Sequence, residues 1–353
     1  MSDQPVSTSI SDEVIDERVP AWSMPEYSQI SAWLEGAGKI WIPLHVSPDG
    51  DCLGSCLAFA RMLRSRGYDC TVLSTDPIPA MYSSLYDRSE VFIGAVPPGP
   101  PPTHIACLDI SDPTRTGAFY EANEEAFLGK NSVKVLNMDH HATNLQFGDL
   151  KLLDTYAAAC AEQVAMAFNE LGWAVDSEIA GYILLGIVTD TLGFRTSATR
   201  ARTLRIASHM MERGASLYRI IDDVFNTRPL STIMLWSVAL ARVSLGANGR
   251  VIYIHITPDM LDKAGAKEEE LEGLASYLSS VRGDVKVAAV LKERDGTTRA
   301  SLRSNPGVDV ASIARRFGGG GHPQAAGATI PATGEEADRL FLAACIEVLS
   351  AEC

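Results

Sequence analysis

Short apolar runs alternate with helical sequence in the first half of the chain, and this alternation restricts the fold more than any other feature. Strands are predicted at 39–48, 68–74, 103–110 and 133–138. A small-residue turn at Gly54-Ser55 and a helix over 56–66, with Gly67 as its C-cap, are expected between the first two runs. Such alternation favours an α/β domain built on a doubly wound, mainly parallel sheet.

Acidic and histidine side chains stand at the ends of three of these predicted strands. Asp49 and Asp51 follow the first run, and Asp109 ends the third. The triplet Asp139-His140-His141 ends the fourth. Ligands of open α/β sheets bind at the carboxyl ends of the strands, so these side chains are expected to share one site. Carboxylate and imidazole together suit Mn²⁺, Zn²⁺ or Fe²⁺ better than a pure oxygen site would.

Several converging carboxylates require counter-charge. Without cations they would repel and raise one another's pKa values, and two divalent cations would relieve that repulsion. A bridged pair of cations about 3.5–4 Å apart can also generate a hydroxide for phosphoryl displacement. Taken singly, each residue has a structural explanation as an N-cap or as a hydrogen-bonded core side chain. Taken together at separate strand and helix ends, they indicate a site: His45, Asp49, Asp51, Asp109, His140 and Asp190.

The chain changes character near Pro229, which marks a break in a long helical region. Helices are predicted before it at 157–171 and 179–188, and a helical connector after it at 231–243. Strands at 251–256, 285–291 and 298–303 then alternate with helices at 268–282, 308–317 and 335–351, with a hairpin turn at Asp295-Gly296. The predicted organisation is a tail (1–37), a first domain (38–228), the connector (229–246) and a smaller α/β domain (247–353).

A run of four glycines, Gly318 to Gly321, precedes His322 in the second predicted domain. Glycines allow backbone N–H groups to approach a ligand closely, and such groups can bind anions. Arg303 ends a strand shortly before, and a guanidinium group suits a terminal phosphate. The alternative is a flexible hairpin loop beside a surface arginine. Because ordering four glycines costs considerable chain entropy, a role in ligand binding is favoured.

Charge and cysteine usage limit the class of protein. The formal net charge of −14 disfavours stable binding of duplex DNA, although a short nucleic acid could sit in a locally positive pocket with bound metal. No apolar run reaches the roughly 18 residues of a membrane span, and the acidic N-terminus has no signal-like apolar region. Seven scattered cysteines without a Cys-x-x-Cys pair predict a reducing, cytoplasmic setting, in which Cys52 and Cys56 serve packing rather than ligation.

With these residues assembled, residues 38–345 resemble the DHH phosphoesterase superfamily with a C-terminal DHHA1 domain. The resemblance is to the branch of nanoRNases and phosphatases of 3′-phosphoadenosine 5′-phosphate (pAp). Its motifs are His45-Val46-Ser47-Pro48-Asp49-Gly50-Asp51, Asp109 in CLDISDP, Asp139-His140-His141 with Asn144, Gly186-Ile187-Val188-Thr189-Asp190-Thr191, Arg303-Ser304, and the run GGGGHPQAAG from Gly318. Each motif is moderately specific, and their order strengthens the resemblance.

The resemblance implies a two-domain enzyme with two Mn²⁺ ions, or Mg²⁺ in their place, in a cleft between the domains. The six residues of the candidate set would be the metal ligands, with Asp109 as the bridge. His141 would face the scissile phosphate, and Asp139 would orient the histidines. The far phosphate or nucleotide of a short RNA or nucleotide substrate would be held by Arg303, Ser304, Gly318, Gly319, Gly320, Gly321 and His322. A homodimer is also expected from the family.

One residue departs from the family pattern. Leu192 stands where a glycine is expected directly after Thr191, which puts a close backbone contact there in doubt. The same motifs would serve hydrolysis of cyclic di-AMP or its linear product pApA, which stays open as the alternative function. A processive single-strand exonuclease is disfavoured by the acidic charge, and a DHHA2-type pyrophosphatase by the glycine run. A catalytically silent nucleotide-binding protein is disfavoured because no metal ligand is missing.

Overall fold

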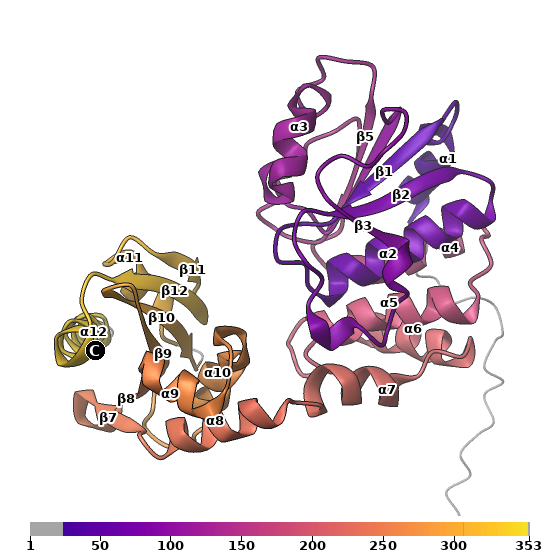
Figure 1. Cartoon of the computed structure of the whole chain (residues 1–353). Coiled ribbons are helices and arrows are strands. Elements are labelled where there is room, and N and C mark those ends of the chain that lie inside the picture. The colour runs from indigo at the N-terminus through magenta and orange to yellow at the C-terminus, as the bar shows by residue number, and fades with distance from the viewer. Residues whose placement is uncertain (1–23, 306, 352–353) are drawn as a thin grey trace, which may run out of the picture. The chain divides into compact units, whose positions relative to one another are not determined.

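The computed structural model describes residues 24–305 and 307–351. The chain divides into two compact units, Met1–Thr227 and Arg228–Cys353, which are called the first and second unit and are described separately (Figure 1). None of the helices in the described part of the chain combines the length and hydropathy that a bilayer crossing requires.

The first unit is built on a six-stranded, all-parallel sheet with the order β3-β2-β1-β4-β5-β6. This confirms the predicted parallel α/β fold. The strand order reverses between β1 and β4, so the connections after these two strands diverge and leave room for a ligand at their carboxyl ends. The strands are β1 (Lys39–Pro43), β2 (Asp69–Ser74), β3 (Val91–Ile93), β4 (His104–Leu108), β5 (Lys134–Asp139) and β6 (Leu150–Leu153).

Helices cover both faces of this sheet (Figure 1). Side chains alternate between the faces, so Ile40 and Ile42 join one apolar cluster and Trp41 joins the other. The larger cluster packs against α2 (Gly50–Ser65), α4 (Cys160–Glu170), α5 (Ser177–Asp190), α6 (Ala201–Glu212) and α7 (Leu217–Ile221), and the smaller one against α3 (Ala118–Phe127). The edge strands β3 and β6 were not predicted, because runs of three and four residues are too short for a clear pattern.

The predicted turn at Gly54-Ser55 is wrong, because α2 begins six residues before the expected start at Cys56. Asp49 starts the helix by accepting hydrogen bonds from the backbone N–H groups of Asp51 and Cys52 at 3.1 and 3.0 Å. Gly54 lies inside the helix, where a Cβ atom would come within 2.3 Å of the carbonyl oxygen of Tyr182 on α5. The glycine therefore marks close packing of two helices rather than a turn.

This packing predicts opposite effects for two helical glycines. Gly54→Ala should lower the free energy of unfolding by about 1–3 kcal/mol, because the new methyl group forces α2 and α5 apart. Gly181→Ala on α5 should raise it by about 0.5–1 kcal/mol, because no atom lies within 4 Å of the new Cβ and alanine favours the helix. Denaturant titration of both variants checks this, and equal stability of the two would contradict the close contact.

Part of the predicted N-terminal tail is ordered. Residues 1–23 lie outside the described residues, but the chain forms the 3₁₀ turn η1 (Pro25–Ser28) and the helix α1 (Gln29–Trp33). Tyr27, Ile30 and Trp33 are buried in the first unit. The tail prediction is therefore wrong for this stretch, where apolar residues at spacings of three line one side of a short helical segment.

The second unit contains a mixed six-stranded sheet with the order β11-β12-β10-β9-β8-β7. Only β8 and β9 pair in parallel among these described strands. The predicted hairpin between β9 and β10 is confirmed, since Asp295 and Gly296 form its turn with φ values of 49° and 75°. The strands are β7 (Ser244–Gly246), β8 (Val251–Ile256), β9 (Val287–Arg294), β10 (Thr297–Ser304), β11 (Gly320–His322) and β12 (Ala325–Ile330).

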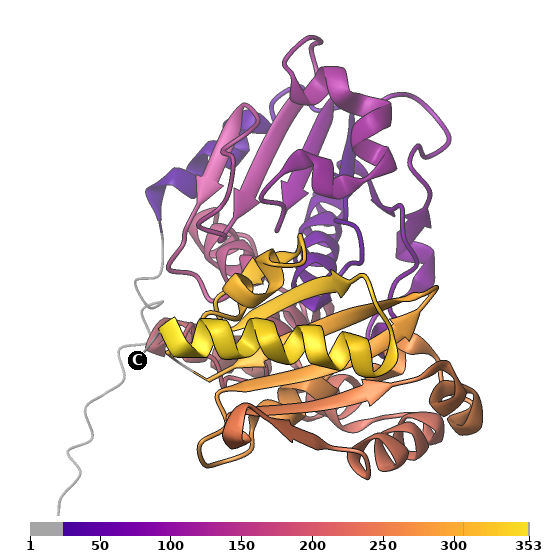
Figure 2. The same cartoon turned by 90° about the vertical axis from the view of Figure 1, so that its left-hand side faces the viewer.

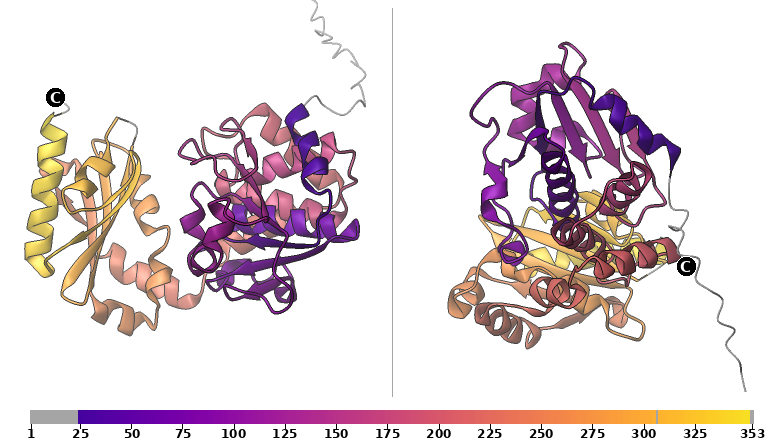
Figure 3. Two further views of the ribbon diagram at one scale, coloured as in Figure 1. Left: turned by 90° about the horizontal axis from the view of Figure 1, so that it is seen from above. Right: turned by 90° about the vertical axis from the view of Figure 1, so that its right-hand side faces the viewer.

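Helices pack on both faces of this sheet (Figures 2 and 3). One face carries α11 (Val310–Arg315) and α12 (Gly334–Ala351), and the other carries α8 (Leu230–Leu240), α9 (Pro258–Ala264) and α10 (Leu274–Ser279). The predicted connector differs from the structure, because Leu235 and Ala239 of α8 are fully buried in the second unit. The predicted helix over 268–282 is interrupted at Gly273, which has a φ of +84°. This glycine separates a 3₁₀ turn (Glu268–Leu271) from α10.

Candidate metal centre and phosphate-binding loop

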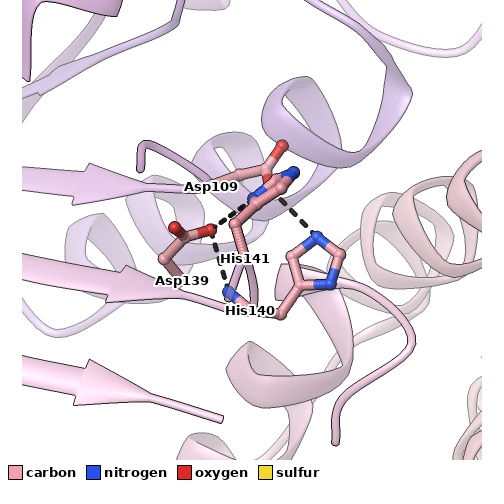
Figure 4. A group of neighbouring side chains, drawn as sticks. All are labelled: Asp109, Asp139, His140 and His141. Atoms are coloured by element: carbon pink, nitrogen blue, oxygen red, sulfur yellow. Dashed lines mark hydrogen bonds and ion pairs between the residues drawn. The ribbon is translucent and has the colours of Figure 1, made fainter. Parts of the chain in front are cut away.

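Residues that follow β1, β4 and β5 meet at the carboxyl edge of the first sheet. Figure 4 shows Asp109 after β4 beside Asp139, His140 and His141 at the end of β5. The structure brings the whole predicted set together: His45, Asp49, Asp51, Asp109, His140 and Asp190.

Two histidines turn the same ring nitrogen toward the carboxylates. Nδ1 of His45 lies 2.9 Å from the carbonyl oxygen of Val46, and Nδ1 of His140 lies 3.3 Å from that of Ala157. Because a carbonyl oxygen can only accept, both Nδ1 atoms carry the proton. Nε2 of His140 is left facing Asp109 Oδ1 at 3.4 Å, and Nε2 of His45 faces Asp109 Oδ2 at 3.7 Å. This is the orientation in which histidines ligate metals.

Asp109 lies between the two histidines, with one carboxylate oxygen directed at each. Its side chain is buried, and its φ of +61° is in the left-handed region, which is rare for residues other than glycine, asparagine and aspartate. Such strained backbone is retained where the surrounding structure requires it.

The described residues leave polar atoms of this site unsatisfied. Oδ1 of Asp109 and Nε2 of His140 are both shielded from solvent and have no hydrogen-bond partner. Buried polar atoms without a partner are costly, and here they face each other among further carboxylates. A divalent cation would satisfy both atoms, and the nitrogen and oxygen donors suit such an ion. The residues therefore fit a metal centre.

The electrostatics of the site without metal point in the same direction. Burial, together with Asp109 and Asp190, raises the pKa of Asp51 well above its usual value. Burial raises the pKa of Asp190 to about 6; His140 lowers it in part, and Asp109 and Asp49 raise it further. Burial alone would lower the pKa of His140, but the neighbouring carboxylates raise it to about 10. These shifts are expected where carboxylates crowd together without the counter-charge that divalent cations would provide.

The carboxylate of Asp51, which lies on α2, is fixed by hydrogen bonds at the start of α4. Its Oδ2 accepts a hydrogen bond from the N–H group of Cys160 at 2.6 Å, and its Oδ1 accepts from Ala161 at 2.9 Å and from the Ser55 hydroxyl at 3.1 Å. The carboxylate therefore caps a helix far away in sequence while Oδ2 remains 3.8 Å from His140 Nε2. A fixed carboxylate of this kind gives the site a defined geometry.

Asp139 orients the second histidine of the motif. Its Oδ1 lies 2.8 Å from Nδ1 of His141, and its Oδ2 accepts from the side chain of Asn144 at 2.6 Å. Burial would raise the pKa of Asp139, but these hydrogen bonds lower it. The same hydrogen bond raises the pKa of His141. Because Asp139 engages Nδ1, Nε2 is the ring nitrogen of His141 that is left for a substrate.

The sequence interpretation missed several supporting residues. Sγ of Cys52 belongs to a group with His45 and Asp109 whose ligand atoms lie within 4.8 Å of one another, although packing was the favoured explanation for this thiol. Gln163 on α4 donates to the backbone carbonyl of Asp139 at 2.6 Å. The adjacent Glu162 is fully buried and pairs with Arg202. Two neighbouring polar residues inside an otherwise apolar helix were the available signal.

The structure explains how Leu192 is tolerated at the position where the family pattern predicts a glycine. Its φ is +51°, in the left-handed region that favours glycine, and its side chain is 51 % exposed. A leucine is tolerated in this strained conformation because its side chain points into solvent rather than into packed atoms. The glycine expected at this position would relieve the strain.

The predicted phosphate-binding residues lie in the second unit, but part of the glycine run serves the fold. The N–H groups of Gly318 and Gly319 donate to the carbonyl oxygens of Arg315 and Ala314 and close α11. The rest of the run enters β11, which pairs with β12. A Cβ atom at Gly319 would come within 2.2 Å of the carbonyl oxygen of Gly327, so this position requires glycine for packing.

Arg303 and Ser304 end the neighbouring strand β10. Nε of Arg303 lies 3.3 Å from the Ser276 hydroxyl, and burial lowers the pKa of this guanidinium group. The Ser304 hydroxyl donates to carbonyl oxygens at 308 and 323 and so holds the neighbouring loops. His322 is exposed on β11. A contact between these residues and a phosphate stays a prediction.

Two family profiles match the sequence. The profile described as "DHH family, N-terminal domain" matches residues 39–187, and the profile described as "DHHA1 domain" matches residues 248–351.

Named relatives align with most of the chain. A "Bifunctional oligoribonuclease and PAP phosphatase NrnA" from Thermus thermophilus is 33% identical over 83% of this chain and 84% of that protein. A Bacillus subtilis protein with the same name is 29% identical over 84% of this chain and 90% of that protein. The crystal structure of an exopolyphosphatase-related protein from Bacteroides fragilis superposes with a TM-score of 0.83 at 23% identity, covering 93% of this chain and 97% of that one. The last similarity shows a shared fold.

Proposed function

We propose that this chain, which belongs to the DHH family and carries a DHHA1 domain, is a metal-dependent phosphoesterase that hydrolyses short oligoribonucleotides and pAp. The family resemblance seen in the sequence is confirmed by both profiles and by the Thermus thermophilus relative. Two relatives named for these activities align with more than four fifths of the chain. The observation that carries the proposal is the buried, unpartnered pair of Asp109 Oδ1 and His140 Nε2.

Two cations are proposed because Asp109 directs its two oxygens to different histidines. His45 and Asp49 would hold one cation with Asp109, and the other would be held by Asp51, Asp109, His140 and Asp190. Mn²⁺ is the proposed ion and Mg²⁺ the alternative, because the donors are oxygen and imidazole nitrogen. When bound, such ions supply Lewis-acid chemistry, since they neutralise phosphate charge and acidify water.

The protein's own groups position the phosphate and move a proton. We propose that protonated His141, held through Nδ1 by Asp139, donates from Nε2 to the phosphate or to the oxygen that leaves. Asp139 keeps the ring in one orientation through the hydrogen bond of 2.8 Å. In the second unit, Arg303, Ser304, the glycine run and His322 are proposed to hold the terminal phosphate or nucleotide of the substrate.

The state of the cysteines supports a proposed cellular location. All the cysteines that the structure describes are free and buried: Cys52, Cys56, Cys70, Cys107, Cys160 and Cys345. Free thiols suit the reducing cytoplasm, which is the proposed location. Short RNA or nucleotides are the proposed partners, and the homodimer expected from the family stays a prediction.

Arg303→Ala should mainly weaken substrate binding. The guanidinium group is proposed to contact a terminal phosphate that does not react, so KM should rise about tenfold or more while kcat changes little. Steady-state kinetics on pAp check this. Arg299→Ala is the matched control, because Arg299 lies on the same strand and is exposed. An unchanged KM for the Arg303 variant would remove this residue from the substrate site.

The proposed function is tested by assaying the purified protein in Mn²⁺ against an end-labelled RNA dinucleotide, pAp, pApA and cyclic di-AMP in parallel. Release of mononucleotide from the dinucleotide and of phosphate from pAp is expected. Turnover confined to cyclic di-AMP and pApA would move the protein to second-messenger degradation by the same site. Bound metal without turnover of any substrate would favour a silent nucleotide-binding protein.

A further inference from the structure

The segment that follows Asp190 is positively charged in an acidic protein. Residues 191–211 contain four arginines and no aspartate or glutamate, whereas the whole chain has a formal net charge of −14. Arg195, Arg200 and Arg205 are exposed. Of the four, only Arg202 forms an ion pair within the described residues. Guanidinium groups without a carboxylate partner attract anions, and in this protein they concentrate positive charge at one place.

One of these arginines stacks on an exposed aromatic ring. The guanidinium carbon of Arg200 lies 4.8 Å from the ring centroid of Tyr156. The Tyr156 side chain is nevertheless 66 % exposed, so most of the ring remains open. Aromatic rings and guanidinium planes are the surfaces on which proteins stack the unpaired bases of RNA, and the charge of the arginine also attracts phosphate.

The Tyr156–Arg200 pair adjoins the candidate metal centre. Tyr156 directly precedes Ala157, whose carbonyl oxygen lies 3.3 Å from Nδ1 of His140. Nε2 of the same histidine lies 3.7 Å from Asp190 Oδ2, where the arginine-rich segment begins. The segment therefore starts beside His140, and its Arg200 stacks on the residue that precedes Ala157, which contacts the same histidine. A ligand stacked on Tyr156 would lie next to the residues proposed to hold the metal.

The two segments that carry Tyr156 and Arg200 are joined by partly buried ion pairs. Arg202 pairs with Asp154 at 2.9 Å and also with Glu162, which ties the start of α6 to the loop that carries Tyr156. These ion pairs fix the position of the loop that carries Tyr156 relative to α6, and such preorganisation lowers the cost of binding a ligand.

We infer that Tyr156 and Arg200 form a nucleoside subsite beside the candidate metal centre. This subsite takes a nucleoside that a short oligoribonucleotide has and pAp lacks. The inference rests on the proposed function. Both pAp and an oligoribonucleotide bring a reacting phosphate to the candidate metal centre, but only the oligoribonucleotide continues beyond that phosphate into a further nucleoside. The Tyr156–Arg200 pair adjoins this centre within the first unit, so it would take the further nucleoside and select oligoribonucleotides over pAp.

The test compares pApA with pAp, which share one adenosine and two phosphates and differ by one nucleoside. For Tyr156→Ala and for Arg200→Ala in the full-length protein with Mn²⁺, KM for pApA should rise about tenfold, as expected for the loss of one base stack. KM for pAp should stay within about twofold of wild type, since pAp does not reach the subsite. Tyr156→Phe keeps the ring and should retain the wild-type KM for both substrates.

A matched control and a binding measurement complete the test. Arg66 stacks on Trp173 at 4.4 Å elsewhere in the first unit, so Arg66→Ala removes the same charge and type of contact and should change neither KM. The binding probe is a dinucleotide related to pApA, with 2-aminopurine as the base of the nucleoside that pAp lacks. In EDTA, the wild type should quench its fluorescence and the Tyr156→Ala variant should not. This readout needs no turnover, so an inactive wild type would refute only the proposed function. Equal changes for both substrates, an unchanged KM for pApA, or quenching that survives Tyr156→Ala would each overturn the subsite.

Discussion

Asp109→Asn is expected to lower kcat/KM by more than about a hundredfold on every substrate that the wild type hydrolyses. Asp109 directs Oδ2 to His45 and Oδ1 to His140, so it is the one carboxylate proposed to serve both cations. An amide has one oxygen and no charge, and cannot replace a bridging carboxylate. Steady-state kinetics on the RNA dinucleotide and on pAp measure the loss.

Asparagine is the right replacement because of the backbone at this position. The φ of +61° is tolerated by asparagine, whereas alanine would add strain to the loss of the carboxylate. The melting temperature without metal should therefore stay close to that of the wild type. Asp112→Asn is the control, because Asp112 lies in the same connection after β4. Among the described residues its side chain accepts hydrogen bonds only from Thr114, and an asparagine can accept them too. More than a hundredth of wild-type activity in the Asp109 variant would falsify the two-metal assignment.

Removal of divalent cations should abolish activity, and Mn²⁺ should restore it. The same ion should stabilise the first unit, because it binds the folded site and not the unfolded chain. At a hundredfold excess over the dissociation constant the gain is about 2.7 kcal/mol, or roughly 5–10 °C in melting temperature for a domain of this size. Calorimetry after chelation, with and without added Mn²⁺, measures the shift.

The variant at Asp109 also serves as a control for this experiment. Its melting temperature should respond much less to Mn²⁺ than that of the wild type, because the shared ligand is gone. Restoration of activity by Zn²⁺ and not by Mn²⁺ would contradict the choice of ion while leaving the site in place. A melting temperature that ignores every divalent cation would contradict the metal centre itself.

Local patterns were sufficient for most of the first unit. Apolar runs of six to ten residues located β1, β2, β4 and β5, because buried strands need apolar side chains on both faces. Acidic and histidine residues at the ends of these runs identified the candidate ligands, because parallel strands present their carboxyl ends at one edge. The hairpin at Asp295-Gly296 was equally accessible, since its turn requires residues that tolerate positive φ.

One turn was predicted incorrectly because two distant segments touch there. Gly54 resembles a turn residue, but its real constraint is the carbonyl oxygen of Tyr182, far along the chain on α5. In the glycine run, the contact with phosphate stays a prediction, and the structure adds a packing requirement at Gly319 from the backbone of the adjacent strand at Gly327. Both packing constraints are tertiary, so the residue type was visible in the sequence and its cause was not.

The sequence by itself determined the parallel α/β fold of the first unit and the residues that can hold metal, because both depend on short-range patterns of apolar and polar residues. Only the tertiary structure decided how these residues are oriented. It placed Asp51 on the first N–H groups of α4 and left Nε2 of His140 without a partner. It also brought Arg200 onto Tyr156. Such contacts join residues tens of positions apart, and their energies depend on packing that no local pattern contains.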